Sequence, residues 1–315
     1  MNLAHLHLLL NHFPTVGMII GLGLFLAALL WNSDHLKRAS LGVFLAIGLI
    51  AMPTYMTGNA AQEILAQHPS SAALHLTALI EAHQSWALLA FILISLNGLL
   101  AWTGLWQYRR HSRPAAWILP AVLVCSAASF GTMGIAANLG GDIMHPEVRD
   151  VADGRASWMI SAFSQSVIKA AVTDSTKIWA ACEAIHFMGL AILFGMVLLI
   201  DLRILGFLKG VSFESIHKLL PYAVAAYAVN LATGMTFFIA ASDQYTGNPV
   251  FYWKVGLLLL ASANLAYFTV MDDSWLLKAG ENAPGRTKFA AVTALVLWIG
   301  VMYAGRMLPF IGNAF

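Results

Sequence analysis

The sequence predicts an all-α polytopic membrane protein with about eight transmembrane helices in two four-helix modules. Of its 315 residues, 59% are hydrophobic and only 10% are charged, whereas soluble domains carry about 25% charged residues. The apolar residues form continuous runs close to the roughly 20 residues that a helix needs to cross a bilayer, and they do not alternate as in a membrane β-barrel. This composition excludes an intrinsically disordered chain, and a net charge of +2 gives no support for nucleic-acid binding.

Eight apolar segments are expected to span the membrane. They cover residues 8–31, 39–57, 85–106, 115–137, 178–201, 219–241, 250–271 and 288–310. An even number of spans places both termini on one side, which we call side A; the opposite side is side B. Of the 17 Lys and Arg residues, eleven fall on side B and six on side A. The positive-inside rule therefore predicts that side B is cytoplasmic and that both termini are periplasmic or extracellular.

The polar stretch between the fourth and fifth spans divides the chain. We expect a first four-helix module over residues 1–150, a linker on side A over 151–177, and a second four-helix module over 178–315. The linker contains a moderately amphipathic piece, SWMISAFSQSVIKAAV, which is predicted to lie on the outer membrane surface. The two cysteines, Cys125 and Cys182, lie in apolar runs without a C-x-x-C-H motif, so covalently attached c-type haem is excluded.

The eleven histidines are unevenly distributed between the two sides. Three lie on side B beside Lys or Arg at span ends, which is typical of interfacial residues: His35, His111 and His217. The other eight lie on side A or in the part of a helix nearest to it: His5, His7, His12, His68, His75, His83, His145 and His186. An imidazole inside hydrocarbon needs a polar partner, so intramembrane histidines are candidate functional residues.

The first module contains the best candidates for haem ligands. His12 begins the first span and His83 the third, and both spans start at side A. Two histidines at one depth on facing helices are what axial ligation of a b-type haem requires. We therefore predict His12 and His83 as the leading ligand pair. His7 and His145 are predicted to reach the same layer, either as spare residues or as ligands of a second haem; helix-end hydrogen bonding is the alternative for each.

The second module has a possible proton-handling pair. Glu183 and His186 stand at i and i+3 on one helix face. This E-x-x-H element occurs in di-iron carboxylate proteins, but the other spans lack a second copy. We expect a haem ligand supported by a carboxylate, or a pair that exchanges protons with quinol. Lys254 is predicted either to extend toward the interface or to line a head-group pocket with Asp243 and Tyr245, and Glu183 and Lys254 are the candidate catalytic residues.

Each half resembles an uncharacterised family of bacterial membrane domains. The first half resembles a four-helix family through H-x-x-x-x-H-F-P (residues 7–14), T-G (57–58), His83 and G-G-x-x-x-H (140–145). That resemblance implies a link to Rieske and c-type cytochrome systems, although Leu8 stands where members usually have proline. The second half resembles another family through I-H-F-M-G-L-A-I-L-F-G (185–195), D-L-R-I-L-G (201–206) and N-P-V-F-Y-W-K (248–254). Both resemblances imply a bacterial inner membrane.

The sequence thus predicts a cytochrome b-like subunit of an oxidoreductase complex. It is expected to bind one or two b-type haems and to transfer electrons between the quinone pool and a periplasmic cytochrome or dehydrogenase. Two alternatives stay open. One is a transporter for a small solute or metal ion, against which the apolar centres of most spans argue. The other is a structural anchor for partner subunits.

Overall fold

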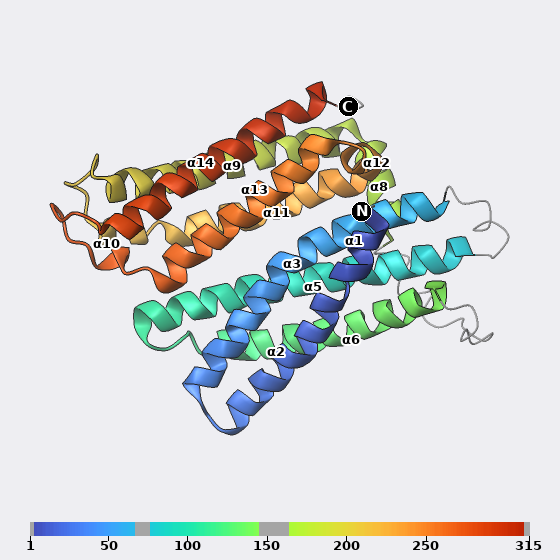
Figure 1. Ribbon diagram of the computed structural model, residues 1–315, viewed down its shortest axis with the longest axis horizontal. Coiled ribbons are helices and arrows are strands. Elements are labelled where there is room, and N and C mark those ends of the chain that lie inside the picture. Colours follow the sequence, from blue (N-terminus) through green and yellow to red (C-terminus); the bar gives the residue numbers. More distant parts are fainter. Residues whose placement is uncertain (1–2, 67–75, 145–163, 312–315) are drawn as a thin grey trace. The chain divides into compact units, whose positions relative to one another are not determined.

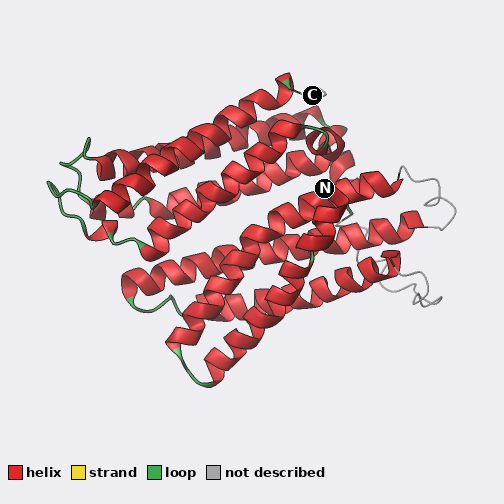
Figure 2. Ribbon diagram, in the orientation of Figure 1, coloured by secondary structure: helices red, strands yellow, loops and turns green. Residues whose placement is uncertain are grey.

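The chain folds entirely into helices and their connections. The computed structural model describes residues 3–66, 76–144 and 164–311, and within these ranges it contains no strand (Figure 2). Eight helical segments of the described chain are long and apolar enough to cross a membrane, which confirms the predicted all-α polytopic class. The chain divides into two compact units, Met1–Ala170 and Ala171–Phe315, so the division falls within the expected linker.

The first unit is built around one long central helix. Its helices are α1 (Leu3–Leu10), α2 (His12–Leu30), α3 (Asp34–Ala66), α5 (Leu76–His111) and α6 (Ile118–Met144), followed by the start of α8 (Gln165–Thr173). Helix α5 packs against both α3 and α6, and α2 packs against α3 and α6 (Figure 1). The short α1 packs mainly against α3, which brings the N-terminal residues onto the bundle.

The helices α3 and α5 extend well beyond the spans expected from the sequence. The expected segments were 39–57 and 85–106, whereas α3 covers Asp34–Ala66 and α5 covers Leu76–His111. A hydropathy window detects only the part of a helix that lies in hydrocarbon, and polar turns can continue the same helix outside it. His83 therefore lies two turns inside α5 and not at its beginning.

A break at Asn11 separates α1 from α2 and redirects the N-terminal turns. Pro14 has no backbone N–H and cannot bond the carbonyl of Leu10, so the helix cannot continue regularly through this point. The Asn11 N–H still bonds the His7 carbonyl at 2.9 Å, and the Thr15 hydroxyl donates to the Asn11 carbonyl at 2.9 Å. The break lets α1 pack against α3 while α2 continues along the bundle in a different direction (Figure 1).

Two glycines bring α3 and α5 into close contact. A Cβ atom added at Gly48 would lie 3.1 Å from the Cα of Gly98, and one added at Gly98 would lie 3.1 Å from the Cα of Gly48. Small residues facing each other let membrane helices approach backbone to backbone, where dispersion forces are strongest. This contact sets the spacing of the two helices that carry the candidate site.

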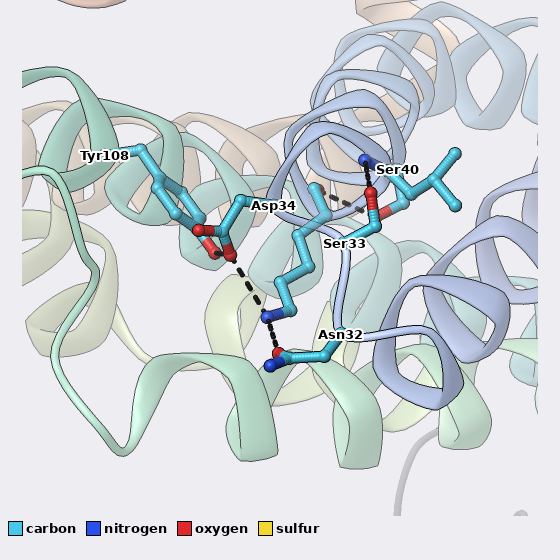
Figure 3. Close-up of polar contacts among 7 residues, drawn as sticks. Asn32, Ser33, Asp34, Ser40 and Tyr108 are labelled. Carbon is cyan, nitrogen blue, oxygen red and sulfur yellow. Dashed lines mark hydrogen bonds and ion pairs between the residues drawn. The ribbon is translucent and has the colours of Figure 1, made fainter.

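On side B, a polar cluster joins the α2–α3 turn to the end of α5 (Figure 3). Lys37 is buried, and its ammonium donates to the side chains of Asn32 at 2.7 Å and Asp34 at 3.1 Å. The hydroxyl of Tyr108 on α5 donates to the same Asp34 oxygen at 3.3 Å. Asn32 adopts a positive φ of 47°, a conformation that asparagine tolerates better than most residues. The hydrogen bonds of the cluster satisfy the buried ammonium of Lys37 and thereby hold the turn between α2 and α3 in place.

The second unit is a bundle in which α9 packs against α11 and α14, and α13 packs against α14. Its long helices are α9 (Thr176–Leu205), α11 (Leu220–Ala240), α13 (Pro249–Ala266) and α14 (Gly285–Met307). Short elements connect or extend them: α10 (Phe213–His217), α12 (Ser242–Thr246), η3 (Tyr267–Met271), η4 (Ser274–Leu276) and η5 (Leu308–Phe310).

One arginine organises the side-B loops of this unit. Arg203 is fully buried, and its guanidinium donates to the backbone carbonyls of Val211 at 2.6 Å, Lys278 at 2.7 Å and Glu281 at 3.2 Å. The planar group with five N–H donors is suited to bonding several carbonyls at once. Arg203 therefore ties the loop after α9 to the loop before α14.

The glycine contact between α3 and α5 gives a test of this packing. Replacing Gly48 with alanine should destabilise the protein by roughly 1–3 kcal/mol, because the new methyl group forces the two backbones apart. The measurement is the thermal unfolding midpoint of the detergent-solubilised protein. Gly42→Ala is the matched control in α3, since nothing lies within 4 Å of a Cβ at that position. Equal midpoints for the two variants would contradict the packing argument.

Candidate functional site

His7 on α1 bonds the backbone of α3. Its Nδ1 lies 3.0 Å from the carbonyl oxygen of Thr54, and a carbonyl can only accept, so Nδ1 carries the proton. The ring lies against Gly58, where an added Cβ would be 2.9 Å from Cε1 of His7. The other ring nitrogen, Nε2, therefore keeps its lone pair for another partner.

His83 on α5 repeats this arrangement against α6. Its Nδ1 lies 2.8 Å from the carbonyl oxygen of Ala136, which again places the proton on Nδ1. The ring lies against Gly140, where an added Cβ would be 3.2 Å from Cε1 of His83. The Nε2 lone pair is again the one left for a ligand.

The two histidines share one local design. In each case the accepting carbonyl and the glycine are four residues apart on one helix, Thr54 with Gly58 and Ala136 with Gly140. A helical carbonyl points toward the residue four positions later, so a ring that bonds this carbonyl from the side must lie where the Cβ of that later residue would be. Glycine removes the Cβ and makes the hydrogen bond possible.

His7 and His83 lie toward the side-A end of the first unit, and both are partly buried. The residues next to the His7 contact and to His83 are joined, since Asn59 follows Gly58 and accepts a 3.0 Å hydrogen bond from Gln84. His12 is exposed, and its Nδ1 bonds the Leu8 carbonyl of the preceding turn at 3.0 Å. The expected pairing of His12 with His83 is thus not what the described geometry favours.

The first module has four further side-A histidines. His5 is exposed. His68, His75 and His145 lie outside the described residues, so the expectation that His145 reaches the same layer stays a prediction. Among the described residues, no three His, Cys, Asp or Glu side chains gather into one group.

An amide network lies directly beside the two histidines. The side-chain oxygen of Asn59 on α3 accepts from Gln84 on α5 at 3.0 Å and from Gln165 on α8 at 2.7 Å. The hydroxyl of Tyr55 donates to Gln165 at 3.2 Å, and its ring stacks on Phe91 with centroids 5.1 Å apart. Because Asn59 follows Gly58 and Gln84 follows His83, the network fixes the elements that carry the histidine site.

In the second unit, His186 on α9 is held by a hydroxyl instead of a carbonyl. Its Nδ1 lies 2.7 Å from Oγ1 of Thr233 on α11, and that hydroxyl donates to the Val229 carbonyl at 2.7 Å. The hydroxyl proton is therefore engaged, so its oxygen accepts from Nδ1–H and the Nε2 lone pair stays available. The His186 Cε1 lies 3.6 Å from where a Cβ would stand at Gly234.

The other predicted residues of this module separate into two groups. Lys254 on α13 is partly buried and lies five residues after the start of its helix, in the side-A half of the bundle that also contains His186. Its Nζ lies 3.5 Å from where a Cβ would stand at Gly305 on α14. Glu183 is exposed, and no hydrogen bond joins it to His186 in the described structure. The carboxylate of the E-x-x-H element thus does not support the imidazole.

Asp243 and Tyr245 lie on the short helix α12, where Asp243 is exposed and Tyr245 is partly buried. The Tyr245 ring packs between Phe238 and Phe251, with centroid separations of 6.1 Å and 5.0 Å. Burial raises the pKa of the Tyr245 hydroxyl to about 12, so this residue stays neutral at physiological pH. Its surroundings are those of an aromatic packing residue.

Sequence reasoning did not identify the groups that orient the histidines. Gly58 and Gly140 were noted as parts of motifs, but without their role in admitting an imidazole. Gln165 was read as part of an amphipathic surface piece, whereas its side chain is buried in the amide network. The signal that could have found them is a glycine four residues after the carbonyl that accepts from a histidine. This spacing occurs twice, but the accepting carbonyls are known only from the structure.

Comparison of the chain with family models, with curated proteins and with solved structures finds no match. The resemblances of the two halves to bacterial membrane families therefore stay predictions from their motifs.

The amide network provides a test of how the site is held. Asn59→Leu should destabilise the protein by about 1–3 kcal/mol, because the amides of Gln84 and Gln165 then lose their shared acceptor in a buried position. Thermal unfolding in detergent measures the change. Thr132→Val is the control, since Thr132 is only partly buried and its hydroxyl bonds carbonyls of its own helix in the described structure; it should change stability by less than about 0.5 kcal/mol. A similar loss in both variants would refute the role of the network.

Proposed function

We propose that the protein is a b-type haem-binding membrane subunit that transfers electrons between the quinone pool and a periplasmic redox partner. The observation that carries the proposal is the arrangement of His7 and His83. Each imidazole donates its Nδ1 proton to a backbone carbonyl of a neighbouring helix, each leaves Nε2 unprotonated, and both lie toward the side-A end of the same bundle.

The residues present suit an axial ligand pair. A metal-bound histidine characteristically donates its second ring N–H to a carbonyl or carboxylate, which fixes the tautomer and raises the basicity of the ligating nitrogen. Both histidines meet this condition before any ligand is considered. When bound, haem supplies an iron that exchanges single electrons, with a potential tuned by its axial ligands and its burial.

The site lies near the side-A ends of its helices. His83 is seven residues after the start of α5, and Ala136 is eight residues before the end of α6, which corresponds to about 10–12 Å along each axis. Together with the orientation that the positive-inside rule predicts, this depth supports a site in the periplasmic half of a bacterial inner membrane. Such a position supports exchange with a periplasmic cytochrome or dehydrogenase, within a larger oxidoreductase complex.

His7 replaces His12 in the proposed pair. Five residues separate the two positions, which corresponds to about 140° around a regular helix, and the break at Asn11 lies between them. His145, which lies outside the described residues, remains a candidate ligand of a second haem.

The proposal predicts an absorption spectrum and its dependence on single residues. The protein purified from haem-replete membranes should show a Soret band and, after reduction with dithionite, the α-band of a b-type cytochrome. His7→Ala and His83→Ala should each remove most of the haem of this site, because each variant lacks one of the two imidazoles that would hold the iron. Haem content is measured by the pyridine haemochrome assay.

His12→Ala is the matched control, since it removes an exposed histidine five residues away. It should retain the haem of the parent protein if His7 and His83 are the ligand pair. Absence of a Soret band in the parent protein, or unchanged haem content in both His7→Ala and His83→Ala, would refute the proposal.

A further inference from the structure

The second unit contains a polar cluster that haem ligation in the first unit does not use. It consists of His186 on α9, Asn230 and Thr233 on α11, and Lys254 on α13. The Lys254 Nζ lies 3.5 Å from where a Cβ would stand at Gly305 on α14, the helix that packs against α9. His186 lies ten residues after the start of α9, and Thr233 lies seven residues before the end of α11, which places them about 10–15 Å from the side-A helix ends. A group of polar side chains at this depth is costly in hydrocarbon and indicates a binding function.

Asn230 supplies an acceptor without a partner. Its amide nitrogen donates to the Ala226 carbonyl at 2.9 Å, which settles which end of the amide is the oxygen. That oxygen, Oδ1, is buried and finds no hydrogen-bond partner among the described residues. An orphaned buried acceptor calls for an explanation, and a bound ligand is one of the few. Asn230 lies against α9 at Gly189, where an added Cβ would be 2.5 Å from Nδ2.

The cluster offers both kinds of hydrogen-bonding group. Thr233 fixes the tautomer of His186, so its Nε2 can only accept. The Lys254 ammonium has three N–H donors and no acceptor. A partner that satisfies both must therefore present a donor to one and an acceptor to the other. The nearby ammonium also opposes the binding of a cation, which makes a metal-ion site unfavourable.

The surroundings favour an aromatic ring that arrives from the bilayer. Phe237 packs edge-on to His186 with ring centroids 5.7 Å apart, and Trp179 packs on Phe237 at 5.0 Å. On α9, Ile185, Phe187 and Met188 around His186 are exposed, as expected for residues that face lipid. A ligand dissolved in the membrane can reach the cluster without crossing a polar surface.

We infer that this cluster binds the head group of a quinone or quinol, with Lys254 donating to a ring oxygen and His186 accepting from a hydroxyl. Asn230 provides a further acceptor for the reduced form. The inference rests on the proposed function, because it gives the quinone named there a location in the second unit. Glu183 is not part of the site, since its side chain is exposed.

Binding of a decyl-substituted 1,4-benzoquinone to the full-length protein in nanodiscs tests the inference. Isothermal titration should show saturable binding of about one quinone per chain above the signal of protein-free nanodiscs. Lys254→Met should weaken binding about tenfold or more, because it removes a charge-assisted hydrogen bond. Lys254→Arg should restore most of the affinity, since it keeps a cationic donor. Lys218→Met is the control: Lys218 is exposed and pairs only with Glu214 at 3.9 Å.

Thr233→Val provides a second test that leaves both binding groups in place. It removes the acceptor that fixes the His186 tautomer and should weaken binding of the reduced quinol more than that of the quinone. The inference is overturned if the parent protein binds no quinone saturably, if Lys254→Met and Thr233→Val both bind like the parent, or if His186→Leu removes a haem. Soret absorbance is recorded for every sample, so a missing haem with intact quinone binding refutes only the proposed function.

Discussion

Every described histidine within the two bundles depends on one constraint: an imidazole N–H in an apolar environment must find an acceptor. Burying such a donor without a partner costs several kcal/mol on hydrocarbon-like scales. Helical carbonyls are already bonded and are partly covered by the side chain four residues later, so a glycine at that position leaves room for an imidazole to reach the carbonyl. Gly58 and Gly140 provide this opening for His7 and His83. The hydrogen bond then determines which ring nitrogen keeps its lone pair.

The rest of the first unit places the rings where this bond can form. The break at Asn11 lets α1 lean on α3, so His7 reaches the Thr54 carbonyl. The contact between Gly48 and Gly98 holds α3 close to α5, and the amide network around Asn59 fixes the same two helices beside the histidines. At the other end, Lys37 and Asp34 lock the turn between α2 and α3. The contact between Gly48 and Gly98 and the hydrogen bonds of the amide network thus both hold α3 against α5.

The fold class followed from the sequence because bilayer crossing requires long apolar segments, and these are visible without a structure. The positions of the helix ends could not be predicted in the same way, since α3 and α5 continue through polar turns beyond their apolar segments. The choice between His7 and His12 also depended on structure: both lie in one apolar N-terminal segment, and the packing of α1 on α3 brings His7 to the Thr54 carbonyl. The spacing of Glu183 and His186 gives a shared helix face but not the direction of the bundle, so the sequence did not show that Glu183 is exposed.

Under the two proposals, the units use the same tautomer for different chemistry. In the first unit two imidazoles are bases at Nε2, and two bases are best satisfied by a shared Lewis acid such as a haem iron. In the second unit the base at His186 shares the side-A half of its bundle with the ammonium of Lys254, and the two are best satisfied by a ligand that both donates and accepts. A quinol provides both functions on one ring, because one hydroxyl can donate to Nε2 while the oxygen of the other accepts from the ammonium. The hydroxyl of Thr233 suits this role, because it holds the imidazole with a side chain and leaves the backbone of α11 regular.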